Sequence, residues 1–192
     1  VEPPPAAKKI RELFYSAFFV ADHATHFFVL AGPDLILGPD APRETRTILG
    51  VFQAVGSEVT RQIVACRGRN REVIQMLGGR RIHPAAALPG GWSVALTEEM
   101  RRRVEEVARG NVELALGFLR LFESTVLRRP EIAELMVAEG FTDRTYSMGT
   151  VDGDGRRDVY DGRVGVGGPD GGQFALFEPT EYASHIAERV EP

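Results

Sequence analysis

One carboxylate and two imidazoles lie close together in an apolar stretch near the start of the sequence. Asp22 and His26 are four positions apart, and His23 and His26 are three apart. On a helix, both spacings place the side chains on neighbouring positions of one face. Such a group can move protons, or it can hold zinc or iron. The alternative, which spacing alone favours, is a hydrogen-bonded cluster in the core, since buried polar groups are usually paired.

A second polar group lies in a glycine-rich loop. Residues 78–84 read GGRRIHP, and a second glycine pair follows. Glycine pairs permit positive φ and a close approach of the backbone. Arg80, Arg81 and His83 could face an anion, a cofactor or a partner from this loop, or they could be solvated side chains of a tight connection. The segment is not a phosphate-binding loop, because no Lys-Ser or Lys-Thr pair follows at the required spacing.

The cysteine content limits the metal chemistry. Cys66 is the only cysteine in 192 residues. An internal disulfide and a metal site made of cysteines alone, such as an iron–sulfur cluster, are therefore excluded within the chain. We expect Cys66 to be a small buried side chain at a helix end. A reactive thiol is the alternative, since Arg67, Arg69 and Arg71 place positive charge nearby.

Charge and hydropathy limit the partners and the location. The net charge is −4, and nothing in the composition suggests the basic face that non-specific nucleic-acid binding needs. The longest apolar stretch, residues 14–37, is interrupted by charged residues, histidines and a proline. The sequence therefore predicts no transmembrane segment and a cytoplasmic protein.

Hydrophobic periodicity predicts that most of the chain is helical. Gly32-Pro33-Asp34 should end the first helix, and Thr97 is a suitable cap for a later one. The arginine run at 101–103, with glutamates on both sides, predicts a solvated helix face. The expected helices are residues 6–30, 42–66, 71–77, 97–127 and 131–138.

The pattern changes after residue 145. Short apolar runs separated by glycine-rich turns predict strands at residues 147–151, 157–160, 163–166 and 174–177, followed by a helix at 179–190. The sequence DGDG at 152–155 suits a hairpin turn better than a calcium loop, because further oxygen ligands are missing. The predicted fold class is mainly α, a long-helix bundle with a small antiparallel β-meander near the C-terminus. The predicted parts are a helical bundle at 1–145, the meander at 146–178 and a C-terminal helix at 179–192.

The sequence carries the motif around Asp22 first and the glycine-rich motif at residues 78–84 second. In this order, the two motifs resemble those of the large subunit of nickel–iron hydrogenases. That family carries a pattern like DHxxHFF, often followed by LAxPD, and residues 22–28 and 30–34 read DHATHFF and LAGPD. Its next block looks like GGRxxHP followed by GG, similar to residues 78–84 and 90–91. The tail, with YDGRV and FEPTEYASHIAE, is similar to the β-rich insert of the soluble hydrogenases that reduce NAD(P) or F420. The resemblance spans essentially the whole chain.

The resemblance implies a function and roles for the site residues. The complete enzyme would oxidise dihydrogen reversibly at a NiFe(CO)(CN)2 centre in the large subunit, with an iron–sulfur small subunit as its partner. Asp22 would lie near the metal site, outside its ligands, and influence proton movement. His23 and His26 would support that site or pack the helix. Arg80 and His83 would face the small subunit, toward its nearest cluster.

The chain departs from the family in lacking both CxxC motifs, whose thiolates hold the nickel. We therefore expect a fragment of such a subunit that holds no metal by itself, is inactive alone, and tends to self-associate through exposed apolar faces. One alternative is a nickel-free hydrogenase-like scaffold or assembly protein that acts through protein–protein contacts. Another is an unrelated metal enzyme that uses Asp22, His23 and His26.

Overall fold

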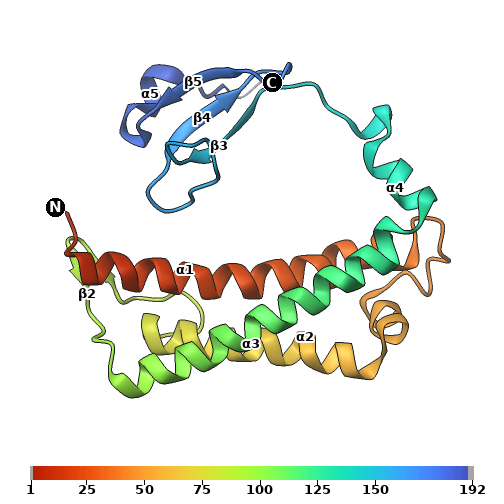
Figure 1. Cartoon of the computed structure of the whole chain (residues 1–192), viewed down its shortest axis with the longest axis horizontal. Helices are drawn as coiled ribbons and strands as arrows, with labels where there is room; N and C mark the ends of the chain where they lie inside the picture. The colour runs from red at the N-terminus through yellow and green to blue at the C-terminus, as the bar shows by residue number, and fades with distance from the viewer. Residues whose placement is uncertain (1, 190–192) are drawn as a thin grey trace. The chain divides into compact units, whose positions relative to one another are not determined.

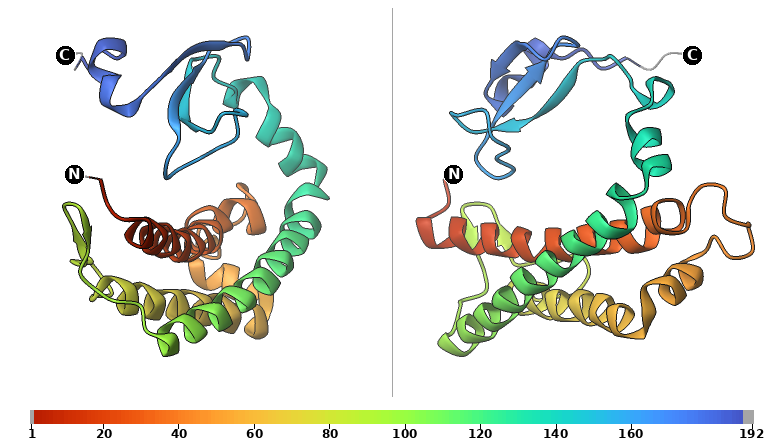
Figure 2. Two further views of the ribbon diagram at one scale, coloured as in Figure 1. Left: turned by 60° about the vertical axis from the view of Figure 1, so that its left-hand side comes forward. Right: turned by 45° about the vertical axis from the view of Figure 1, so that its right-hand side comes forward.

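The computed structural model describes residues 2–189 and divides the chain into two compact units, Val1–Met136 and Val137–Pro192. The first unit consists of long helices and their connections (Figures 1 and 2). The second contains a small antiparallel sheet and short helical turns.

The first helix continues past its predicted end. Helix α1 (Pro5–Thr25) passes into the π-helical turns η1 (His26–Ala31) and η2 (Pro33–Leu37). The prediction that Gly32-Pro33-Asp34 ends the helix is wrong. A π-turn shifts the backbone hydrogen bonds by one residue, so the helix can pass a proline that has no N–H to donate. Helical geometry ends at Gly38, whose φ is 102°.

The helical segment Pro5–Ala31 is long and apolar enough to cross a membrane, judged by length and composition alone. Asp22 and His23 lie within this helix and do not interrupt it. The absence of a transmembrane segment stays a prediction, because length and composition alone do not test it. A core helix passes the same test. In this chain α1 buries Phe14 and Ala17 in a cluster that it shares with other helices.

Helix α2 (Ile48–Gly78) joins two helices that were predicted separately. It begins after Thr47, whose side chain accepts a hydrogen bond from the next turn, and not at Pro42. The predicted break after Cys66 is absent, because Asn70 and Cys66 are both buried there and the Asn70 amide donates to the Cys66 carbonyl at 2.9 Å. The helix bends instead at Gly56, where φ is 84°.

Helix α3 (Glu98–Phe122) begins where the sequence predicted. Thr97 accepts a hydrogen bond from the Met100 N–H at 3.2 Å, which confirms its role as the cap. The helix continues through the π-helical turn η3 (Glu123–Leu127), and α4 (Pro130–Val137) follows after a turn at Arg128 and Arg129. The solvated charged face is also confirmed, with Arg101 paired to Glu98 and Glu105.

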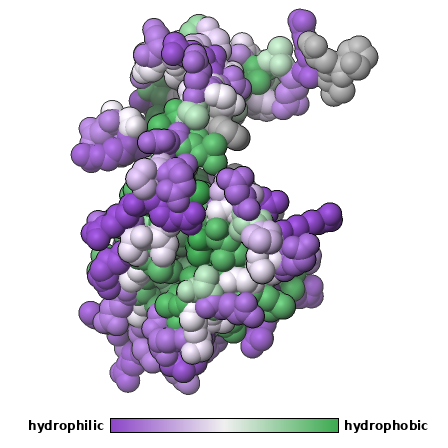
Figure 3. All heavy atoms as spheres, turned by 90° about the vertical axis from the view of Figure 1, so that its right-hand side faces the viewer, coloured by the Kyte–Doolittle hydropathy of each residue, from purple (hydrophilic) through white to green (hydrophobic). Residues whose placement is uncertain are grey.

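Two apolar clusters hold the helices of the first unit together. One combines side chains of α1, α2 and α3; the other lies around Phe28 of η1. Large apolar side chains remain exposed on α3, and Figure 3 shows one face of the helical unit on which apolar residues gather. Self-association stays a prediction. The buried members of the first cluster are Phe14, Ala17, Val73, Ile74, Leu77, Val104 and Val107.

Three of the four predicted strands are confirmed in the second unit. Strands β3 (Ser147–Val151), β4 (Arg163–Gly167) and β5 (Gln173–Phe177) pair antiparallel in that order. The predicted strand at 157–160 is wrong. The Asp158 carboxylate accepts backbone hydrogen bonds from the two residues after Val159, which curls the segment into a turn instead of an extended strand.

The turn at residues 152–156 and the C-terminal helix complete the second unit. The Asp152 carboxylate accepts hydrogen bonds from the N–H groups of Asp154 and Arg156, both at 2.9 Å, so residues 152–156 form the predicted turn. The C-terminal helix is shorter than predicted: a 3-10 turn, η5 (Pro179–Glu181), leads into α5 (Tyr182–His185), which ends at Ile186 in an extended conformation. The predicted end at residue 190 lies outside the described residues.

Candidate functional site

The glycine pair at the end of α2 lets the following loop fold back onto α1. Gly79 has a φ of 79°, the left-handed conformation that ends the helix. A Cβ on Gly78 would lie 2.6 Å from Cβ of Pro84 and 2.9 Å from a ring carbon of Phe14. Only glycine allows this approach, so the expected role of the pair, positive φ and close contact, is confirmed.

A short hairpin anchors the far end of the same loop. Strands β1 (Ala87–Leu88) and β2 (Gly91–Trp92) pair antiparallel. Arg11 of α1 donates to the carbonyls of both Leu88 and Gly91, at 2.8 and 2.7 Å. The Trp92 indole donates to the Leu77 carbonyl at 2.8 Å. The loop is thus held on α1 and α2 at both ends.

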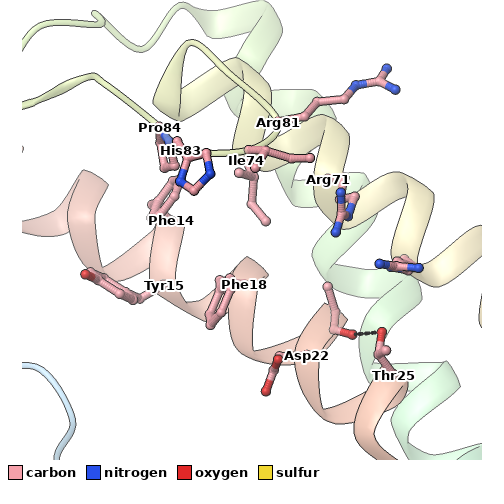
Figure 4. Close-up of a pocket in the computed structure, with 13 residues that line it drawn as sticks. Phe14, Tyr15, Phe18, Asp22, Thr25, Arg71, Ile74, Arg81, His83 and Pro84 are labelled. Carbon is pink, nitrogen blue, oxygen red and sulfur yellow. Dashed lines mark hydrogen bonds between the residues drawn. The ribbon is translucent and has the colours of Figure 1, made fainter. Parts of the chain in front are cut away.

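The fold forms a cleft of about 330 Å³ between α1, α2 and this loop (Figure 4). Its walls are largely apolar and aromatic. Asp22 of α1 and His83 of the loop both line it, so the structure brings together one residue from each of the two sequence motifs. The apolar and aromatic lining side chains are Phe14, Tyr15, Phe18, Ala21, Ile74, Ile82 and Pro84.

Three arginines line the cleft: Arg67 and Arg71 of α2, and Arg81 of the loop. Arg67 and Arg71 are four positions apart, and both line it. Within residues 2–189, neither guanidinium takes part in a hydrogen bond or an ion pair, and neither does the Asp22 carboxylate. Figure 4 shows Asp22 on the α1 side and Arg71 on the α2 side of the cleft. From sequence, Arg67 and Arg71 are predicted only as charged neighbours of Cys66; their i, i+4 spacing is the signal for a shared helix face.

The two histidines of the first motif lie outside this cleft. His23 and His26 are exposed, and the His23 ring contacts the Phe19 carbonyl at 2.8 Å and the edge of the Phe19 ring. The interpretation as a buried core cluster is wrong, because Asp22 is exposed as well. In the described part of the chain, no three His, Cys, Asp or Glu side chains are grouped to hold a metal ion, which leaves the two-histidine metal enzyme without a geometric basis.

Of the three candidate residues in the glycine-rich loop, Arg81 and His83 line the cleft and Arg80 does not. Arg80 is exposed and does not line the cleft. The Arg81 guanidinium extends away from the cleft in Figure 4, and its Nε donates to Gln75 at 2.7 Å. His83 has a φ of 53°, a left-handed conformation that is uncommon for residues other than glycine.

Cys66 is a buried side chain in the middle of α2, and only 1% of it is exposed. Burial raises the pKa of its thiol, and the opposing effects of Arg69 and the Asn70 hydrogen bond are smaller. The prediction that Cys66 is buried is confirmed, but the prediction that it lies at a helix end is wrong. The alternative of a reactive thiol is wrong, because such a thiol needs an exposed and electropositive position.

Comparison with known proteins shows similarity to hydrogenase subunits. No protein-family model matches the chain. It is 38% identical over its whole length to an iron–sulfur subunit of the F420-non-reducing hydrogenase of Archaeoglobus profundus, covering 40% of that protein. It is 36% identical to a vhu subunit of the F420-non-reducing hydrogenase of Methanocaldococcus jannaschii, again over the whole chain and 44% of the relative. The chain thus spans about two-fifths of the length of these relatives.

A solved structure supports the same similarity. The crystal structure of an "NAD+-reducing [NiFe]-hydrogenase in the H2-reduced state" includes a chain that matches with a TM-score of 0.87 and 30% identity. The match covers the whole of the present chain and 42% of the solved one. Similarity to subunits of hydrogenases is therefore seen in both sequence and fold.

The names of the relatives correct several expectations. The Archaeoglobus relative is named an iron–sulfur subunit, and the related Cupriavidus necator protein is named "NAD-reducing hydrogenase HoxS subunit beta". The assignment to the nickel-binding large subunit is therefore wrong, and with it the NiFe(CO)(CN)2 centre expected in the complete subunit. The expected partner, an iron–sulfur small subunit, is overturned for the same reason. The names do not favour the alternative of a nickel-free scaffold or assembly protein.

Proposed function

We propose that this chain is part of a subunit of a hydrogenase complex, an oxidoreductase that acts on dihydrogen. The observation that carries the proposal is similarity over the entire chain, with 38% identity to one hydrogenase subunit in sequence and a TM-score of 0.87 to a hydrogenase structure. These residues contribute to the subunit a unit of long helices that carries the cleft of Asp22, Arg67 and Arg71. The cytoplasm is its proposed location.

The iron–sulfur cluster implied by the name of one relative does not fit the residues present. Protein clusters are held by several thiolates, in a few cases with histidines. This chain has a single cysteine, Cys66, which is buried and hydrogen-bonded to Asn70. His23 and His26 are exposed on α1 and form no metal-holding group among the described residues. We therefore assign no electron-transfer step to these 192 residues.

Asp22 remains the proposed functional residue of the cleft. Its carboxylate is exposed, lines the cleft from α1, and has no hydrogen-bond or ion-pair partner within residues 2–189. A carboxylate in this position can accept and release a proton without breaking an existing contact. We propose that Asp22 assists proton movement in the complex, outside any metal ligand set.

The test uses the protein purified with the subunits that accompany it. Hydrogen-dependent reduction of a viologen dye is the expected activity, and its absence from an intact complex would contradict the hydrogenase proposal. We expect Asp22→Asn to lower the rate. The matched control is Asp34→Asn, an acid of the same helical segment that pairs with Arg46 at 3.6 Å and does not line the cleft. Equal rates in the two variants would remove the role of Asp22 and leave the hydrogenase assignment standing.

A further inference from the structure

The arginines of the cleft carry unbalanced charge. Arg67 and Arg71 lie one turn apart on α2, and like charges at this spacing repel. Other arginines of the unit are paired, as the ion pairs Arg61–Glu58, Arg103–Glu72 and Arg129–Glu131 show. Arg67 and Arg71 differ in having no ion-pair partner in the described part of the chain, and Arg71 is half-buried. A bound anion between them would therefore lower the electrostatic free energy of the cleft.

The rest of the cleft indicates what kind of anion fits. Phe14 and Phe18 of α1 and Ile74 of α2 line it beside the arginines, and Figure 4 shows their side chains on the two sides of the hollow. These surfaces would cover an apolar body, and they would gain little from a small hydrated ion. The volume of about 330 Å³ lies within the size range of small-ligand sites.

We propose that this cleft binds a carboxylate attached to an apolar, ring-sized body. The carboxylate would pair with Arg67 and Arg71, whose planar guanidinium groups match its geometry. The apolar body would pack on Phe14, Phe18 and Ile74. This site does not depend on the hydrogenase assignment, and either proposal can fail without the other. The same chemistry could come from a small organic acid or from the C-terminal carboxylate of a peptide.

Substitutions of Asp22 and of Arg71 should change the affinity for a carboxylate in opposite directions. Its carboxylate lines the cleft and would repel a bound anion. Arg71→Gln should therefore weaken carboxylate binding, by about tenfold if a charge-assisted hydrogen bond is lost, and Asp22→Asn should strengthen it. Both positions are at least partly solvent-accessible, so neither change disturbs the core. The matched control is Arg61→Gln, which removes an exposed arginine of the same helix outside the cleft.

The experiment is a titration followed by calorimetry and by amide chemical shifts. The probes are 3-phenylpropionate, its neutral alcohol 3-phenylpropanol, inorganic phosphate, and the dipeptide Gly-Phe as acid and as amide. We expect saturable binding of the acids, with shifts at residues 14–22 and 67–84, and weaker binding of the alcohol, the amide and phosphate. Tighter binding of the peptide acid would identify a peptide C-terminus as the source of the carboxylate. Tighter binding of phenylpropionate would identify a small organic acid as the source.

Three results would overturn the proposal. One is no saturable binding of any acid at millimolar concentration. Another is phosphate binding as tight as that of phenylpropionate, which would remove the role of the aromatic walls. The third is equal affinity in Arg71→Gln, Asp22→Asn and the Arg61→Gln control, which would place the probe elsewhere. Circular dichroism of each variant establishes that it is folded before its affinity is compared.

Discussion

Asn70 of α2 and Asn111 of α3 exchange two hydrogen bonds, at 3.0 and 2.9 Å, across the helix interface. Asn70 is completely buried, and its amide group also donates to the Cys66 carbonyl at 2.9 Å. A buried amide that loses its partner keeps the full cost of its desolvation. This reciprocal pair therefore fixes how α3 docks on α2, and sequence periodicity gave no sign of it.

Asn111→Ala should lower the free energy of unfolding by about 1–3 kcal/mol, because it leaves the Asn70 carbonyl group buried without a donor. Urea unfolding followed by circular dichroism measures the change. A double-mutant cycle with Asn70→Ala should give a coupling energy clearly different from zero. Additive effects of the two substitutions would show that the pair does not act as a unit.

Gly78→Ala should lower the free energy of unfolding by about 1–3 kcal/mol through overpacking. Its Cβ would meet Pro84 and Phe14 at 2.6 and 2.9 Å, so the loop that carries His83 must shift. The matched control is Gly68→Ala on the same helix, where a Cβ meets nothing within 4 Å. That control should raise stability by about 0.5–1 kcal/mol. Similar losses in both variants would contradict the close approach at Gly78.

Cys66 should react slowly with a thiol reagent in the native protein. The side chain is 1% exposed, and burial raises the pKa of the thiol, so little thiolate is present and the reagent has no access. The reaction with 5,5′-dithiobis(2-nitrobenzoate) should become fast in denaturant. Rapid labelling under native conditions would contradict the continuous packing of α2 around this residue.

Glu98 should make stability depend on acid pH. Hydrogen bonds from Arg101, then Arg102, lower the pKa of this carboxyl to about 2 in the folded chain. The unfolded chain takes up the proton near the ordinary glutamate pKa of about 4.3. The contribution is therefore present above that ordinary pKa and is lost as the pH falls toward 2. Thermal unfolding at several pH values between about 4.3 and 2 measures this contribution. The Glu98→Gln variant should lose less stability than the parent protein over the same pH range. If stability depends on pH equally in the Glu98→Gln variant and the parent protein, solvent screens the interaction of Glu98 with the arginines.

The sequence by itself determined the elements whose signals are local. Thr97 caps α3, and Pro130 opens α4, because a cap or a proline acts on the turn in which it lies. The strands predicted at 147–151 and 163–166 follow from short apolar runs bounded by turn residues, and the structure extends the second by one residue. The buried state of Cys66 was predicted from the character of the residue.

Tertiary structure decided the rest. Pro33 predicted the end of a helix, but a π-helical turn continues through it to Leu37. The face of α1 that is buried depends on how α2 packs against it, and this packing left Asp22, His23 and His26 exposed. The cleft unites Asp22, Arg71 and His83 only because Gly78 lets the loop close on Phe14. Such contacts join residues about 60 positions apart, and a pattern confined to one helix turn carries no information about them.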